Sequence, residues 1–101
     1  MTELTLELLD RWQAESGETI AEGNHDVTFD DFRAIVRCFP GGVFVPDGHA
    51  EMNNGNFSHI DTVFIDPSKI DASGVDGERT WIVGPDELTI EKSGMIRVWY
   101  D

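Results

Sequence analysis

The sequence contains a single cysteine, Cys38, so it can form no internal disulfide and matches no zinc motif that needs several cysteines. Its longest apolar runs are triplets such as residues 63–65, far short of the roughly 20 residues that cross a bilayer. The chain also opens without the basic stretch of a secretory signal. We therefore expect a cytoplasmic protein with no membrane span.

Basic residues are also scarce. Seven Lys and Arg stand against 20 Asp and Glu, which leaves a formal net charge of −13, and no lysine precedes Lys69. Contacts with phosphate groups need Lys and Arg, so this composition argues against nucleic acid and anionic membranes as direct ligands. Two interpretations of the acidic surplus stay open. It is either a solubility or salt adaptation or a surface complementary to a basic partner.

Motifs for catalysis are missing as well: there is no glycine-rich phosphate loop, no nucleophile elbow, no His-Glu-x-x-His and no calcium loop. His49-x-Glu51 and His59-x-Asp61 each place two potential metal ligands on one face of a candidate strand, which is a weak indication of a metal site. Cys38 falls near the end of a predicted helix, where the helix dipole opposes a thiolate, and we expect it to be buried. We expect no enzyme activity, no cofactor and no metal.

The apolar residues that are present, 40% of a chain of 101, suffice for one hydrophobic core, and we expect one domain over residues 1–101. Residues 2–15 carry two overlapping patterns. Leu4, Leu6 and Leu8 alternate as in a strand, whereas Leu4, Leu8 and Trp12 share a helical face. The length of the segment favours a helix that ends near Ser16 and Gly17.

A second helix is predicted more clearly. Thr28 can cap its first turn and Asp31 can reach back to complete a capping box. An apolar stripe follows, and Pro40 and two glycines end the segment. The stripe consists of Phe29, Phe32, Ile35, Val36 and Phe39.

The rest of the chain has the pattern of short strands and turns. Strands are predicted at 43–45 and 57–65, and residues 66–68 end the second of them. Turns are predicted at 46–48 and 53–56, and a loop over 71–78. In the last hairpin, a three-residue loop over 92–94 with Gly94 in the left-handed region pairs Ile90 with Ile96 and Leu88 with Val98. That register predicts an apolar face that includes Tyr100, and a solvent face with Thr89, Glu91, Arg97 and Trp99. The fold class is therefore α+β, with two N-terminal helices packed on an antiparallel β-sheet of about five or six strands.

The acids are concentrated at the start of the chain. Residues 1–31 hold nine Asp and Glu against Arg11 alone, so they carry −8 of the −13. On a helix over 2–15, Glu3, Glu7 and Asp10 align opposite Leu8 and Trp12. Exposed tryptophans are enriched in interfaces, so Trp99 is a further candidate for partner binding unless the loop over 71–78 covers it. The candidate partner-binding residues are Glu3, Glu7, Asp10, Glu15, Glu18, Glu22 and Trp99.

Three functions fit these patterns. The first is a non-enzymatic inhibitor or binding protein that docks on a basic, nucleic-acid-binding site of a partner protein, as DNA mimics, anti-CRISPR, anti-restriction and toxin-immunity proteins do. The alternative is a salt-adapted structural or adaptor domain with a generic acidic surface. A small metal-dependent enzyme ranks third.

Overall fold

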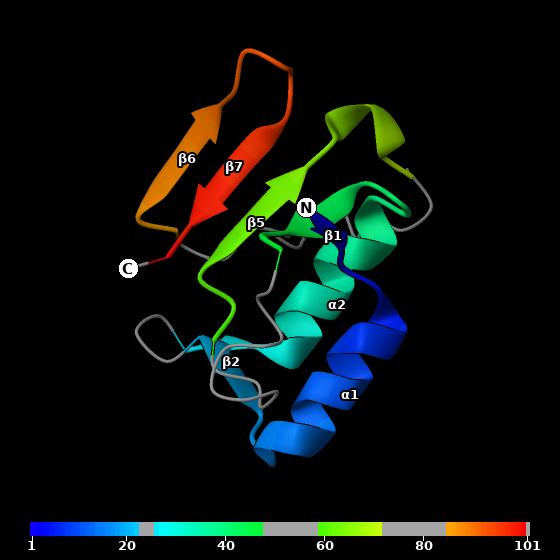
Figure 1. Ribbon diagram of the computed structural model, residues 1–101, viewed down its shortest axis with the longest axis vertical. Coiled ribbons are helices and arrows are strands. Elements are labelled where there is room, and N and C mark those ends of the chain that lie inside the picture. Colours follow the sequence, from blue (N-terminus) through cyan, green and yellow to red (C-terminus); the bar gives the residue numbers. More distant parts are fainter. Residues whose placement is uncertain (23–25, 48–58, 72–84, 101) are drawn as a thin grey trace.

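The computed structural model of the chain describes residues 1–22, 26–47, 59–71 and 85–100. Within them, the N-terminal half holds β1 (Thr2–Glu3), α1 (Leu6–Ser16), β2 (Ile20–Glu22), β3 (Val27–Thr28) and α2 (Phe29–Cys38). The C-terminal half holds β4 (Val43–Val45), β5 (Thr62–Ile65), a short 3-10 helix at Pro67–Lys69, β6 (Glu87–Ile90) and β7 (Ile96–Trp99) (Figure 1). The predicted α+β class is confirmed.

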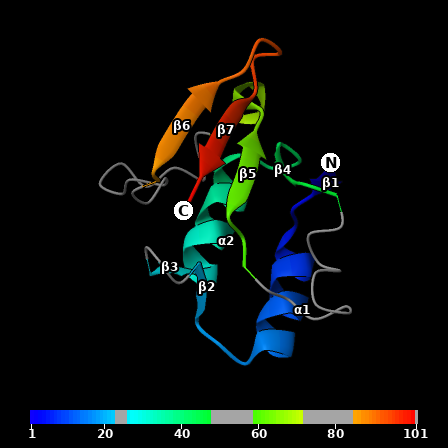
Figure 2. The same cartoon turned by 60° about the vertical axis from the view of Figure 1, so that its left-hand side comes forward.

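The strands form two antiparallel sheets. The larger has the order β1-β4-β5-β7-β6, and β2 pairs with β3 in a smaller one. Both helices lie on the same side of the larger sheet, so neither of them covers its other face, which we call the open face (Figures 1 and 2). β6 lies at one edge, away from both helices.

The first helix begins later than the sequence pattern predicts. Thr2 and Glu3 form a strand that pairs with Val45 and Phe44, and the helix begins only after Thr5, whose hydroxyl accepts a hydrogen bond from the Leu8 N–H at 3.1 Å. The prediction of helix over residues 2–5 is therefore wrong, because the alternation there belongs to an extended segment that buries Leu4. The predicted end is confirmed, with Gly17 at φ 68° as the C-cap.

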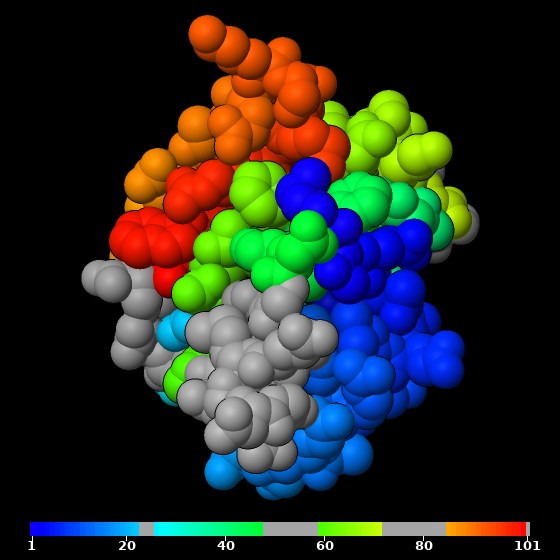
Figure 3. Space-filling model, viewed as in Figure 1, coloured from blue at the N-terminus to red at the C-terminus, as the bar shows by residue number. Residues whose placement is uncertain are grey.

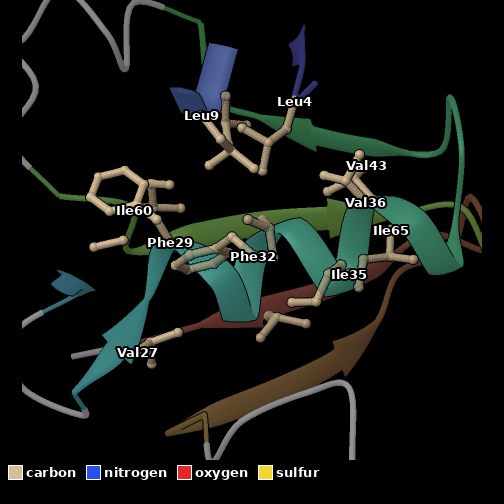
Figure 4. Packing of buried hydrophobic residues seen from close by; sticks show 14 of the residues in the cluster. Leu4, Leu9, Val27, Phe29, Phe32, Ile35, Val36, Val43, Ile60 and Ile65 are labelled. Atoms are coloured by element: carbon tan, nitrogen blue, oxygen red, sulfur yellow. The ribbon is translucent and has the colours of Figure 1, made fainter. Parts of the chain in front are cut away.

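The second helix is confirmed in detail. The Asp31 N–H donates to the Thr28 hydroxyl at 3.1 Å and the Thr28 N–H donates to the Asp31 carboxylate at 2.9 Å, which is the predicted capping box. The apolar stripe of α2 is buried against the sheet (Figure 4). Alternate residues of the strands, Val43, Val63 and Ile65 among them, complete this core from the other side.

The terminal hairpin has the predicted register. Ile90 pairs with Ile96 and Leu88 with Val98, and the Gly94 N–H donates to the Glu91 carbonyl in the three-residue loop. The predicted burial of its apolar face is only half right, because Val98 and Tyr100 are buried whereas Leu88 is 50% and Ile90 74% exposed. The reason is geometric: β6 lies beyond the part of the sheet that the helices cover.

Several expectations lie wholly or partly outside the described residues, namely the turns at 46–48 and 53–56, the start of the strand at 57–65, and the loop at 71–78. The described end of that strand, Thr62–Ile65, is β5, and Asp66 caps the 3-10 helix that follows it.

The capping box yields a test. We expect Thr28→Ala to lower the free energy of unfolding by about 1 kcal/mol, because the Asp31 N–H loses its acceptor. Thr28→Ser keeps the hydroxyl and should retain most of that stability. Urea unfolding of the three proteins measures the difference, and equal losses for Ala and Ser would show that the cap contributes nothing.

Candidate binding surface

Two of the predicted acids, Glu3 and Glu7, lie together in the structure. Glu3 is exposed in β1, where it pairs with Phe44, and Glu7 is exposed in the first turn of α1. A negative side chain in the first turn is favoured by the helix dipole. Neither residue forms an ion pair with another residue of the described part of the chain. Within the described residues neither carboxylate is therefore held in an ion pair, although Arg37 and Arg11 line the same surface.

Glu3 and Glu7 line a shallow open groove of about 510 Å³ between the start of α1 and the end of α2. Leu6, 37% exposed, and Val36, 8% exposed, contribute apolar surface. Arg37 lines the groove from α2, so its β1–α1 side is acidic and its α2 side is basic. The complete lining is Glu3, Thr5, Leu6, Glu7, Val36, Arg37, Pro40 and Gly41. We call this the acidic groove.

Asp10 and Glu15 differ from these two acids because each forms an ion pair with an arginine. The Arg33 guanidinium lies 2.8 Å from Asp10 and 2.9 Å from Asp30, and it also donates to the Gln13 side chain. Arg33 thus links α1 to α2. Glu15 lies 3.8 Å from Arg11 in an i,i+4 pair. Asp10 therefore contributes to holding the helices together, and the predicted ridge of three aligned helical acids reduces to Glu7 and Asp10.

Glu18 and Glu22 lie away from the acidic groove. Glu18 is exposed just after the C-cap of α1, about 16 Å from the start of that helix. Glu22 is only 4% exposed, at the end of β2, so the prediction that it belongs to an exposed recognition surface is wrong. The sequence shows that a residue is acidic, but it does not show whether other parts of the chain bury that residue.

Glu22 and Asp31 instead place negative charge near Tyr100. This tyrosine is 1% exposed, and its ring packs against Phe32 in a T-shaped arrangement with a centroid distance of 6.2 Å. Burial raises the pKa of Tyr100 to about 12, and the nearby negative charges of Asp31 and Glu22 act in the same direction.

Trp99 lies on the open face of the sheet, in β7. It pairs with Thr62 and Glu87, is half-buried, and has the Arg97 guanidinium 6.0 Å from its ring centroid. Glu87 lies 3.4 Å from the same guanidinium. Strand order separates Trp99 from Glu3 by β4 and β5, so the two do not form one compact site.

Sequence reasoning missed the aromatic character of this open face. Phe44 and Phe64 pair with each other there and are both half-buried, between Glu3 on one side and Arg97 on the other. Figure 3 shows the segments of β1, β4, β5 and β7 side by side, from blue through green to red, with neither helix in front of them. The alternation of residues 43–45 and 62–65 carried the signal, since every second residue of a sheet covered on one side faces outward.

The remaining candidates for a chemical role are the predicted metal-ligand pairs and Cys38. No group of three or more His, Cys, Asp or Glu among them could hold a metal ion, and His49 and Glu51 lie outside the described part. Cys38 is buried, as predicted, and burial raises the pKa of its thiol, with the negative charge of Asp71 acting in the same direction. In this part of the chain no helix has the length and apolar character needed to span a membrane.

Comparison of the chain with protein-family models, with curated proteins and with solved structures finds no match in any of the three. The function of this chain is therefore inferred from the geometry and charge of its surface.

The electrostatics of Tyr100 can be tested directly because the chain has one tyrosine. We expect tyrosinate absorbance of the native protein to rise with a midpoint near pH 12, against pH 10 for the unfolded chain. Below pH 10 both states hold the proton, and between the two pKa values only the folded state does, so stability falls as pH rises through this window. A midpoint near 10 with an intact circular dichroism spectrum would contradict the burial of the hydroxyl.

Proposed function

We propose that this protein is a non-enzymatic binding protein, of the inhibitor type, whose acidic groove docks on a basic site of a partner protein. The partner class that fits is a nuclease or another nucleic-acid-binding protein, because a site that binds phosphates presents Lys and Arg. The proposed type is that of DNA mimics, anti-CRISPR, anti-restriction and toxin-immunity proteins.

One observation supports this function most: two exposed acids without an ion-pair partner among the described residues border apolar surface. Glu3 and Glu7 would attract a basic partner over a distance of about a Debye length. Leu6 and Pro40 would then supply apolar area that is removed from water on docking. A surface that serves solubility alone has no need to place acids that form no ion pair beside apolar side chains.

A generic acidic surface is the second candidate, and the distribution of the other acids favours it. Asp26, Asp30, Asp71, Asp86 and Glu87 are exposed on other parts of the described chain, so the acid is not confined to one face. The two candidates differ in whether position matters: in a generic surface any exposed acid is equivalent to any other.

We expect Glu3→Lys/Glu7→Lys to slow association with a basic partner by about tenfold at low salt and to flatten the salt dependence of the rate, because charges at the rim act mainly on encounter. The measurement is the association rate, at two salt concentrations, with a nucleic-acid-binding protein recovered by affinity capture and salt elution. Asp10 is left intact because its loss would remove one of the contacts by which Arg33 links α1 to α2.

Glu7→Lys and Glu18→Lys form a matched pair of controls, since both reverse one exposed charge and they lie at opposite ends of α1. Docking through the acidic groove requires Glu7→Lys to slow association more than Glu18→Lys. Equal effects from both would favour the generic surface and rule out the acidic groove as the contact.

A further inference from the structure

The edge strand β6 leaves both backbone groups and apolar side chains accessible. Of the described strands it is the last in the sheet, and Leu88 and Ile90 on its helix-side face are 50% and 74% exposed. Isolated exposed leucines are common, but two large apolar residues on one strand edge form a continuous apolar strip.

The register fixes which backbone groups point outward. The Glu91 N–H donates to the Met95 carbonyl at 2.8 Å, so Glu91 and Met95 are a hydrogen-bonded pair of the antiparallel ladder. Such pairs alternate along the strands, which makes Thr89 and Arg97 the next one. Leu88 and Ile90 lie between them, so their N–H and C=O groups point away from β7 toward the free edge.

The charges on this edge select what can pair with it. Glu87, which also lies 3.4 Å from Arg97, and Glu91 flank Thr89 on the open face of β6, and Leu88 and Ile90 occupy the other face. A second copy that paired symmetrically about Thr89 would set Leu88 opposite Ile90, but it would also set Glu87 opposite Glu91 twice. Like charges directly opposite each other destabilise a strand pair, so the edge disfavours its own copy in this register.

We infer that the β6 edge binds an extended segment of a partner protein with the pattern basic, apolar, any residue, apolar, basic, added as an antiparallel strand. In this register the two basic residues oppose Glu87 and Glu91, and the two apolar residues oppose Leu88 and Ile90 and exchange main-chain hydrogen bonds with them. Docking at β6 does not require the acidic groove, which lies at the β1 end of the sheet.

The test uses three synthetic peptides and NMR titration of the ¹⁵N-labelled protein. The first has the core Lys-Val-Thr-Val-Lys, the second the core Glu-Val-Thr-Val-Glu, and the third repeats the first with both valine nitrogens methylated. We expect the first to shift the amide signals of residues 87–91 and to protect those of Leu88 and Ile90 from exchange. The methylated peptide should bind about tenfold more weakly or worse, because it lacks the two donors that face β6.

Protein variants separate this site from the acidic groove. Glu91→Lys should weaken binding of the lysine peptide by about fivefold and tighten binding of the glutamate peptide, whereas Glu18→Lys, with the same change in net charge, should leave both nearly unchanged. Glu3→Lys/Glu7→Lys should still bind the lysine peptide, so a failed acidic groove and a failed β6 site give different results.

Three results would overturn the inference. The first is that no amide in residues 87–91 responds to the lysine peptide up to millimolar concentration. The second is that the methylated peptide binds as well as its parent. The third is that the Leu88 and Ile90 signals shift with protein concentration alone, since a second copy would then occupy the edge.

Discussion

The packing of α2 against the larger sheet is the interaction on which the rest of this structure depends. The Thr28–Asp31 capping box determines where the helix begins, and its stripe then meets the alternating residues of the central strands. Phe32 is fully buried and meets Tyr100, near the end of the last strand, edge to face. This one helix thus contacts both α1 and the residue that follows the last strand. Its placement determines which parts of the sheet are covered.

Within the described residues, that placement leaves two regions that the helices do not cover. At one end, β1 and the start of α1 border the acidic groove, where Glu3 and Glu7 lie beside apolar residues of α2. At the other, β6 extends past the helices with Leu88 and Ile90 exposed. Arg33 maintains the first arrangement by linking Asp10 of α1 to α2. The same core packing that stabilises the fold therefore leaves two surfaces of different chemistry for partners.

Local chemistry made part of this predictable. The capping box and the loop at 92–94 depend on residues a few positions apart, so α2 and the hairpin register could be derived from the sequence. Burial could not, because it depends on which element covers which. Glu22 is acidic yet buried, and Ile90 is apolar yet exposed, since the folded chain covers one and leaves the other beyond the helices. The start of α1 was ambiguous for a related reason, as the pairing of β1 with β4 joins residues far apart in sequence.

Native-state hydrogen exchange tests most directly that the helices cover the centre of the sheet and leave the β6 edge free. Within that one strand, the Thr89 amide should exchange slowly because it pairs with Arg97, whereas the neighbouring amides of Leu88 and Ile90 should exchange nearly as fast as an open loop. Amides of Val63 and Phe64 in the central β5 should be among the slowest. Equal protection of Leu88, Thr89 and Ile90 would contradict this account, since it would mean that another part of the molecule or a second copy covers the edge.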